Sequence, residues 1–460
     1  MKRALLPFVA VLCGTASAQV QNTTTSYVYD TVGNLTQITD PLNRITKQDY
    51  DLLRRRIKVT DTNSGVTQYG YDGLDQLTQV TDARNLVTTY TIDGLGQLSK
   101  TISPDTGATT NTYDVAGNLK TRTDAKGQTT TYQYDVLNRP TVISYSDGAS
   151  ASYVYDQGDY GLGRLSQVTD ISGTTSYAYD QHGRVVTETR TIGGQAYVTA
   201  YRYDSAGRLT GLTYPGGRTV DYTHDAMGRI STINTTQDGV TAAVVTQASY
   251  QPFGPVKSIT FGNGQVYTRT YDLDRRVASY TVNGQVQTVS YDADSRITGI
   301  ADAGNAANSR TYGYDLLDRV TSDQRSALSL SYTYDAVGNR TQQSISGAVT
   351  NYTYAAGSNR LTQVAGTQTN AVTMDANGST TGNGTSQFNY DARGRMVSAN
   401  TAIGLVSYKI NALGQRVQKV TPTSTTVFHY DGGGKLIAET TDGATTEYIY
   451  LGDVPVAVFK

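Results

Sequence analysis

Polar and apolar residues alternate over short stretches of the chain, and a similar stretch returns about every 20 residues from Tyr29 onward. Each stretch ends in Tyr-x-Tyr-Asp or a close relative of it, as at residues 201–204. Side chains two residues apart on a strand share a face, so each tyrosine pair marks one face of a predicted strand. Tandem units of this size bury their apolar face only against their neighbours. The pattern therefore predicts an elongated array that makes a wall rather than a domain built around a pocket.

Each unit carries two turn signals about ten residues apart. The first is Tyr-Asp-x-x-Gly-Arg, as at residues 203–208, in which Asp caps backbone N–H groups and Gly takes a positive φ. The second is Asp-x-x-Gly or a tight dipeptide such as Asn283-Gly284, which favours a hairpin. Two turns per unit predict two short strands per unit and hence a long antiparallel meander. The structural signature of the repeat comprises Tyr29, Asp30, Gly33, Tyr71, Asp72, Tyr113, Asp114, Gly117, Tyr134, Asp135, Tyr179, Asp180, Gly183, Tyr203, Asp204, Gly207, Tyr334, Asp335, Gly338, Tyr390, Asp391 and Gly394.

The pattern leaves one question open and contains one irregularity. After the Tyr-Asp turn, Leu77 and Val80 fall on opposite faces of a regular strand unless a bulge intervenes, so the sequence does not show which face is inside. The distance from Met374 to Tyr390 is shorter than the other repeats, and we expect one turn to be missing there.

The composition supports an all-β fold. The chain has 36 Tyr and 46 Gly but no Trp, and Tyr and Thr favour strands while Gly and Asp favour turns. No composition shift interrupts the series, so we expect one region over residues 19–460, with about 20 units of roughly 20–24 residues, forming a curved spiral sheet. The 38 Lys and Arg balance 39 Asp and Glu, which argues against nucleic acid or an anionic membrane as a partner.

Residues 1–18 have the pattern of a secretory signal peptide. Lys2 and Arg3 precede an apolar stretch too short to span a bilayer, and residues 16–18 form a small-residue cleavage site. We therefore expect export to the periplasm, the cell surface or the medium. Cys13 is the only cysteine, so the exported chain would rely on sheet hydrogen bonds and stacked side chains instead of disulfides. No later stretch is apolar and long enough for a membrane span.

The Tyr-Asp-x-x-Gly-Arg-Leu unit resembles the YD repeat of the Rhs family, which includes bacterial polymorphic toxins, wall-associated toxins, shell subunits of insecticidal toxin complexes and teneurins. The resemblance covers about residues 27–460, and residues 432–439, 448–452 and 455–457 are similar to the last stretch of an Rhs core. It implies a β-spiral that curls into a hollow shell, which in family members encloses a toxic C-terminal domain. Some members cut themselves with aspartates downstream of this motif. We expect a partial shell here, because no closing segment, cleavage region or toxin domain follows the motif.

The sequence offers little catalytic chemistry. His182, His224 and His429 lie in separate units, and His224 takes the place of a repeat tyrosine. The segment Asp292-x-Asp294-x-Arg296 begins like a calcium loop, but Arg replaces a ligand, so turn capping is the expected role of these aspartates. We expect no enzyme activity, no catalytic residue, no cofactor and no metal.

Two functional hypotheses remain. The first is a secreted, non-catalytic Rhs/YD-repeat scaffold or shell that encloses or displays another polypeptide, such as a toxin, in a bacterial toxin or contact system. The second is an extracellular adhesion or carbohydrate-binding module, because exposed tyrosines stack on sugar rings. Open strand edges need a cap, so we also expect a partner chain, self-association or a seal at the ends.

Overall fold

The computed structural model describes residues 23–460, and the expected signal peptide lies outside the described residues. Strands pair antiparallel with their neighbours in sequence, in a 33-stranded sheet followed by a 10-stranded sheet. Apart from one 3-10 turn, η1 (Ala306–Asn308), residues 23–460 contain no helix. The prediction of an all-β antiparallel meander is therefore confirmed.

The first sheet consists of β1 (Ser26–Tyr29), β2 (Leu35–Thr39), β3 (Ile45–Tyr50), β4 (Arg56–Thr60), β5 (Val66–Tyr71), β6 (Leu77–Thr81), β7 (Val87–Ile92), β8 (Leu98–Ser103), β9 (Gly107–Tyr113), β10 (Leu119–Thr123), β11 (Thr129–Tyr134), β12 (Pro140–Ser144), β13 (Ser150–Tyr155), β14 (Leu165–Asp170), β15 (Gly173–Tyr179), β16 (Val185–Ile192), β17 (Gln195–Tyr203), β18 (Leu209–Thr213), β19 (Thr219–His224), β20 (Ile230–Gln237), β21 (Val240–Tyr250), β22 (Val256–Phe261), β23 (Val266–Tyr271), β24 (Val277–Val282), β25 (Gln285–Tyr291), β26 (Ile297–Asp302), β27 (Arg310–Tyr314), β28 (Val320–Arg325), β29 (Leu328–Tyr334), β30 (Arg340–Ile345), β31 (Ala348–Tyr354), β32 (Leu361–Ala365) and β33 (Thr369–Ala371). The second sheet consists of β34 (Thr373–Met374), β35 (Thr380–Gly382), β36 (Gln387–Tyr390), β37 (Met396–Thr401), β38 (Gly404–Ile410), β39 (Arg416–Val420), β40 (Thr425–Tyr430), β41 (Leu436–Thr441), β42 (Ala444–Leu451) and β43 (Val454–Phe459).

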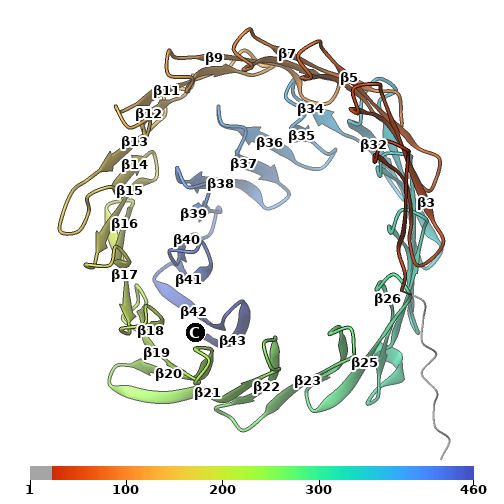
Figure 1. Ribbon diagram of the computed structural model, residues 1–460. Helices are drawn as coiled ribbons and strands as arrows, with labels where there is room; N and C mark the ends of the chain where they lie inside the picture. Colours follow the sequence, from red (N-terminus) through yellow and green to blue (C-terminus); the bar gives the residue numbers. More distant parts are fainter. Residues whose placement is uncertain (1–22) are drawn as a thin grey trace, which may run out of the picture.

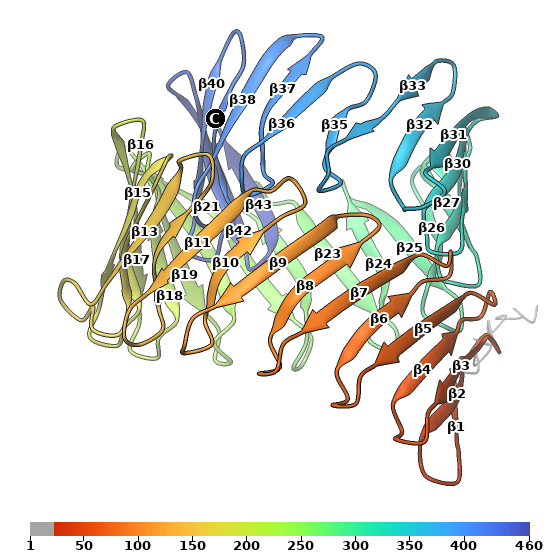
Figure 2. The same ribbon diagram turned by 90° about the horizontal axis from the view of Figure 1, so that it is seen from above.

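The meander curls into a spiral. Figure 1 shows β1 to β33 following one another around a ring, while β34 to β43 turn inside it toward β17–β21. We call β1–β24 the first round and β25–β43 the second round. Figure 2 shows the hairpin turns at two edges of the wall. All Tyr-Asp turns lie at one edge, the YD rim, and the alternate turns lie at the opposite rim, because successive turns of a meander alternate between edges.

A β-bulge decides which face of the sheet the apolar residues share. Tyr71 pairs with Leu77 and Gly70 pairs with Gln79, so Thr78 is the extra residue. Because Tyr69 pairs with Val80, the bulge brings Leu77 and Val80 onto the tyrosine face. The same shift recurs one residue before the repeat tyrosine in other units. The bulge answers the question that the alternation pattern left open.

The expectation of a missing turn between Met374 and Tyr390 is wrong. Gly378 donates its N–H to the Asp375 carbonyl at 3.0 Å, and Asn383 donates to the Ser386 carbonyl at 3.1 Å, so both turns are present. The segment is short because β34 has two residues and β35 has three. These short strands also mark the boundary between the two sheets.

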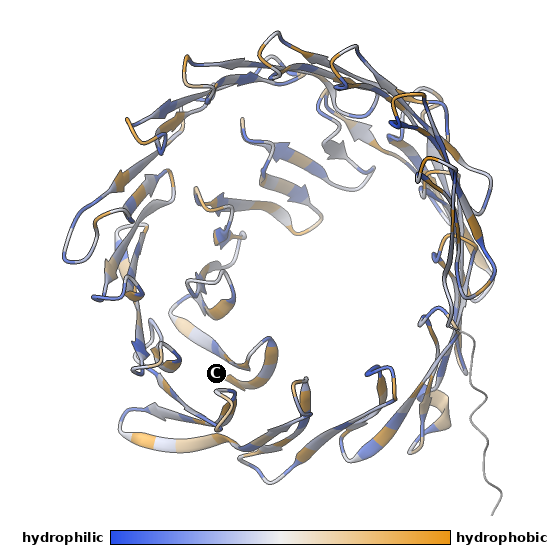
Figure 3. Ribbon diagram, in the orientation of Figure 1, coloured by the Kyte–Doolittle hydropathy of each residue, from blue (hydrophilic) through white to orange (hydrophobic). Residues whose placement is uncertain are grey.

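Apolar side chains become fully buried only where the second round packs against the first. Residues 23–150 and 260–391 contain no buried apolar side chain, and Figure 3 shows apolar positions as short interruptions of a largely polar ring. The main cluster joins β17–β22 with β41–β43. Since β41–β43 lie inside the ring (Figure 1) and contact the tyrosine face of β17–β22, that face is the inner face of the wall.

Candidate functional site: the repeat contacts, the seam and the inner face

The aspartate of the repeat caps its own turn. In the turn at Asp335, one carboxylate oxygen accepts from the N–H groups of Val337 at 3.1 Å and Asn339 at 2.8 Å, and Gly338 has φ 96°. The backbone N–H of Arg139 lowers the pKa of Asp135 in the equivalent turn. Carboxylates cap the turns in the same way at Asp30, Asp72, Asp114, Asp135, Asp180, Asp204 and Asp391. Positive φ also occurs at Gly33, Gly117, Gly183, Gly207 and Gly394.

The tyrosine of the repeat fastens each unit to the preceding one. The Tyr334 hydroxyl donates to the Val320 carbonyl at 2.7 Å, one hairpin earlier in the wall. Burial raises the pKa of Tyr334, as expected for a phenol in a partly apolar site. The same bond to the preceding unit is made by Tyr71, Tyr113, Tyr134, Tyr179, Tyr203 and Tyr390. Tyr29 lies in the first strand and is 59% exposed.

The arginine after the turn glycine joins three groups. Arg319 donates to its own turn aspartate, Asp315, at 2.6 Å and to the carbonyl of the next one, Asp335, at 2.7 Å. Its guanidinium lies 4.8 Å from the centre of the Tyr334 ring. Arg55, Arg184 and Arg296 make the same three contacts. Arg229 makes them too, except that the carbonyl of the next turn belongs to Gln251 instead of an aspartate. Each contact is worth about 1 kcal/mol or less, so the strength of the wall comes from their repetition.

The two rounds meet along a seam in which the opposite rim of the first round contacts the YD rim of the second. Arg84 donates to the Ser358 carbonyl at 2.9 Å, across 274 residues. Farther along, the Gly432 N–H donates to the Tyr201 hydroxyl at 2.7 Å, across 231 residues. The number of residues between two contacting positions falls along the chain, so the second round needs fewer residues than the first to cover the same part of the ring. This agrees with its position inside the ring in Figure 1.

The end of the second round is held by an ion pair and a buried tyrosine. Arg218 pairs with Glu447 in β42, and the two side chains are only 13% and 7% exposed. The Arg218 guanidinium also lies 4.1 Å from the centre of the Phe459 ring. Tyr214, which is 1% exposed, donates to the Tyr448 carbonyl at 2.8 Å. The ion pair, the contact between guanidinium and ring, and the tyrosine hydrogen bond together hold β42 and β43 on the first round.

A second buried polar cluster lies one hairpin away. Arg190 donates to Glu188 at 2.7 Å within β16 and to Gln415 of the second round at 2.9 Å. His429 forms a hydrogen bond with Thr440 at 3.0 Å, and burial lowers the pKa of this imidazole to about 4, with the charge of Arg190 adding to the effect. The imidazole is therefore neutral near pH 7, consistent with a structural role in the seam.

Sequence reasoning missed these clusters, although one signal was available. The chain contains only three glutamates, Glu188, Glu439 and Glu447, among 36 aspartates. Two of the three are almost fully buried. The longer side chain reaches from a strand into the seam, whereas aspartate serves the turns. A rare residue type within a repeat thus marked the contacts between rounds.

The candidates for other chemistry are not brought together. His182 lies on a turn and His224 ends β19 in the place of a tyrosine, and each is in a different hairpin from His429. Asp292 caps its own turn and pairs with Arg296 at 2.7 Å. Over residues 23–460, no group of three or more His, Cys, Asp or Glu could hold a metal ion. A search of the same residues finds no helix with the length and hydropathy of a membrane span.

Comparisons with known proteins agree with this geometry. The chain is similar to the Photorhabdus luminescens Tc holotoxin pore containing a TccC3 variant, with a TM-score of 0.75 and 16% identity over 93% of this chain and 27% of the other. It is also similar to the TcdB2–TccC3 complex, with a TM-score of 0.75 and 16% identity over 93% of this chain and 28% of the other. The chain thus spans little more than a quarter of these structures' chains. No curated protein matches it.

Two family models match the sequence itself. The Teneurin YD-shell model matches residues 305–454. The RHS Repeat model matches residues 29–66, 55–87, 71–108, 113–150, 160–196, 191–219 and 203–240. Together with the fold, these matches show that the chain belongs to the Rhs/YD-repeat family.

Proposed function

We propose that this protein is a non-catalytic wall of an Rhs-type shell, which surrounds or displays another polypeptide. Its action is steric: a curved sheet keeps a segment of chain away from solvent and proteases. The repeat signature residues serve as fasteners that hold the wall in shape, over a single region from residue 19 to residue 460. Export through the signal peptide at residues 1–18 would bring the wall to the cell surface, the periplasm or the medium.

The observation that carries the proposal is an inner face that is largely uncovered. The cluster on β17–β22 is covered by β41–β43, but the tyrosine face of β1–β12 and of β23–β33 has no buried apolar side chain within the described residues. Those tyrosines are partly exposed and line one side of a continuous sheet. Such a face can contact an extended or unfolded polypeptide through its aromatic rings and polar side chains. The similarity to TcdB2–TccC3 complexes supports a polypeptide as the cargo.

A fusion experiment tests enclosure. Lys460 follows β43, whose end lies inside the ring in Figure 1, so a segment attached after Lys460 starts at the inner face. An unstructured reporter with a single protease site is fused after Lys460, and the matched control carries the same reporter before Gln19. We expect slower cleavage of the reporter after Lys460 by at least tenfold. Equal rates for the two fusions would refute enclosure.

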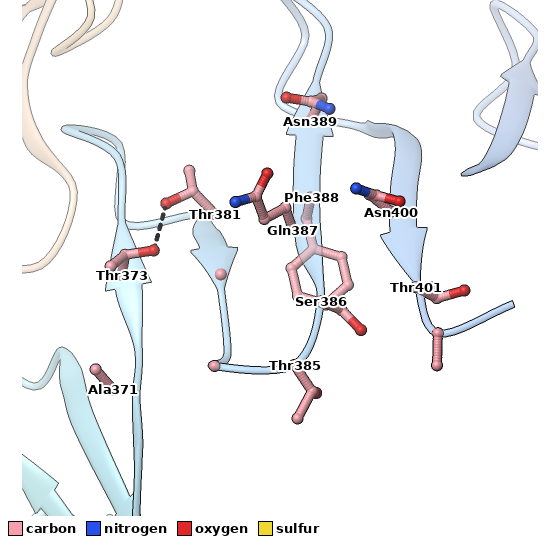
Figure 4. Close-up of a pocket in the computed structure, with 13 residues that line it drawn as sticks. Ala371, Thr373, Thr381, Thr385, Ser386, Gln387, Phe388, Asn389, Asn400 and Thr401 are labelled. Carbon is pink, nitrogen blue, oxygen red and sulfur yellow. Dashed lines mark hydrogen bonds between the residues drawn. The ribbon is translucent and has the colours of Figure 1, made fainter. Parts of the chain in front are cut away.

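A second candidate function, carbohydrate binding, is favoured by one open depression. It lies where β34–β36 are short, has a volume of about 740 Å³ and is lined by hydroxyl and amide side chains beside Phe388. Figure 4 shows Gln387 and Asn400 at this depression, and neither amide has a hydrogen-bond partner within residues 23–460. An aromatic ring beside free amides is a common arrangement for binding a sugar.

A glycan array tests this second candidate. Binding by the wild-type chain that is lost in Gln387→Ala and Asn400→Ala would support it. Gln363→Ala, at an exposed glutamine in β32 outside this depression, is the matched control. The repeat tyrosines are less suited to this role, because their hydroxyls already bond to neighbouring units. An array without any bound glycan would eliminate the candidate.

A further inference from the structure

Six arginines of the strands have no carboxylate partner among the described residues. They lie on the inner face, because each is directly across from a residue of the tyrosine face or two residues along the same strand from one. We call them the inner arginines: Arg56, Arg122, Arg269, Arg310, Arg340 and Arg416. None of the six forms an ion pair within residues 23–460. The arginines of the Tyr-Asp turns differ, since Arg184, Arg296 and Arg319 each pair with the aspartate of their own turn.

Aromatic rings hold four of the inner arginines in place. The Arg56 guanidinium lies 5.1 Å from the centre of the Tyr69 ring, and the Arg340 guanidinium lies 4.4 Å from the centre of the Tyr352 ring. Arg269 and Arg416 lie in the same way over Tyr267 and Phe428. A guanidinium has five N–H donors, so one that lies over a ring still has donors at its edge for a further partner.

The carboxylates of the inner face do not neutralise these charges. Glu188 pairs with Arg190 at 2.6 Å, and Asp323 pairs with Arg325 at 2.7 Å. The hydrogen bond from Arg325 lowers the pKa of Asp323, and the charge of Arg310 adds to the effect, so two guanidiniums act on one carboxylate there. The strands of the inner face therefore carry an excess of positive charge, although the whole chain has a formal net charge of -1.

We propose that the polypeptide held by this wall is acidic and that its carboxylates bind the inner arginines. This inference rests on the proposed enclosing function, and it adds the chemistry of the partner. A carboxylate accepts from two N–H groups at the edge of a guanidinium while the ring covers the face of that guanidinium. Arg122 lines a cavity of about 470 Å³ between β9–β12 and the second round, which has room for an acidic side chain. Opposite charges would also fix the path of an extended segment along the wall.

The spacing of the inner arginines favours a polypeptide over a nucleic acid. Arg56 in β4 and Arg122 in β10 are six strands apart, which is about 28 Å along the wall. Arg310 in β27 and Arg340 in β30 are three strands apart, about 14 Å. A nucleic-acid strand carries a phosphate charge about every 3.4 Å, so most of its charges would meet no arginine. Carboxylates distributed along a polypeptide match the wider spacing.

Binding of unstructured peptides to residues 19–460 tests the charge preference. Three peptides of equal length differ only at every third position, which is Glu, Lys or Ser, and a single-stranded DNA of equal length is the polyanion that is not a peptide. Fluorescence anisotropy measures the affinities at low and at moderate salt. We expect the Glu peptide to bind at least tenfold more tightly than the Ser peptide and the DNA, with an affinity that falls as salt rises.

Substitutions on the two faces of the wall assign the preference to the inner arginines. Arg56→Gln combined with Arg122→Gln should weaken binding of the Glu peptide at least fivefold. The matched control, Lys47→Gln combined with Lys100→Gln, removes the same number of charges from the outer face of nearby strands and should bind like the wild type. Arg56→Glu combined with Arg122→Glu should shift the preference toward the Lys peptide, which an unfolded variant would not do.

Protection of a single cysteine locates the bound peptide, since residues 19–460 contain no cysteine. Thr130→Cys places a thiol on the inner face, directly across from Arg122, and Gln133→Cys places one on the outer face of the same strand. The Glu peptide should slow thiol labelling of Thr130→Cys and leave that of Gln133→Cys unchanged. Slower labelling of Gln133→Cys alone would place the peptide on the outer face and overturn the proposal.

Three further results would also overturn it: equal affinities for the Glu and Ser peptides, a double glutamine variant that binds the Glu peptide like the wild type, or a DNA that binds as tightly as the Glu peptide. The reporter fusion after Lys460 remains a separate test when its reporter is uncharged. Protection of that reporter without a preference for the Glu peptide would refute this inference alone. A preference for the Glu peptide without protection of the reporter would refute enclosure and support the acidic partner.

Discussion

The ion pair between Arg218 and Glu447 provides a direct test of the seam. The pair connects positions that are 229 residues apart, and its side chains are 13% and 7% exposed. One Glu447 carboxylate oxygen has no hydrogen-bond partner within the described residues. Removing one member of such a pair leaves a buried charge uncompensated, which costs about 3–5 kcal/mol, whereas replacing both by apolar residues is often close to neutral. Arg218→Met should therefore be strongly destabilising, and Arg218→Met combined with Glu447→Met much less so.

Native-state hydrogen exchange is the suitable assay, because the last strands can detach without unfolding the rest of the wall. In Arg218→Met, peptides of β42 and β43 should exchange at least about a hundredfold faster, since 1.4 kcal/mol corresponds to tenfold. Peptides of β5–β8 should not change, which provides the internal control. In the double variant, most of the protection should return. Two results would refute the proposed coupling of the two rounds. One is a double variant in which the free-energy costs of the two substitutions simply add. The other is a loss of protection that is equal over the whole chain.

Three further predictions concern the repeat and the seam. Tyr334→Phe should cost about 0.5–1.5 kcal/mol in urea unfolding, because the hydroxyl bond to the Val320 carbonyl is lost; an unchanged midpoint would contradict the tyrosine contact. Gly338→Ala should lower the free energy of unfolding by about 1–2 kcal/mol, because Gly338 has φ 96°. Gly73→Ala should leave it nearly unchanged, because Gly73 has no positive φ and an added Cβ would meet no atom within 4 Å. Burial lowers the pKa of His429 in the folded state to about 4. The stability that depends on its neutral imidazole is therefore fully present above pH 6.5 and is lost as the pH falls toward 4. This loss amounts to about 3 kcal/mol and should be absent from His429→Phe.

Local chemistry made the repeat predictable from sequence. The turns follow from Asp and Gly at fixed positions, and the strands follow from Tyr-x-Tyr, because each of these features depends on residues within one hairpin. Asp335 and Gly338, for example, need only their own turn to adopt the observed geometry. The family resemblance rested on the same local motif, which explains why the sequence indicated both the fold and the family.

The seam could not be predicted in the same way. Whether Arg84 meets Ser358 depends on the curvature accumulated over a whole round, and no local pattern records that curvature. The inner face was equally hidden, because it depends on a bulge at Thr78 whose sequence resembles that of an ordinary strand. The shortened segment at β34–β35 was misread as a lost turn, since spacing alone does not distinguish a missing turn from shorter strands.

Enclosure requires the seam as well as the sheet. The contacts made by Tyr, Asp and Arg join only neighbouring units, so they would hold an open ribbon together as well as a closed wall. What turns this ribbon into a spiral is the set of contacts across some 230–270 residues, from Arg84 to Glu447. Those contacts use buried glutamates and a neutral histidine, which the repeat consensus lacks. Selection for a shell should therefore act on the positions where a unit departs from the repeat, and these departures are the best guide to residues that close the wall.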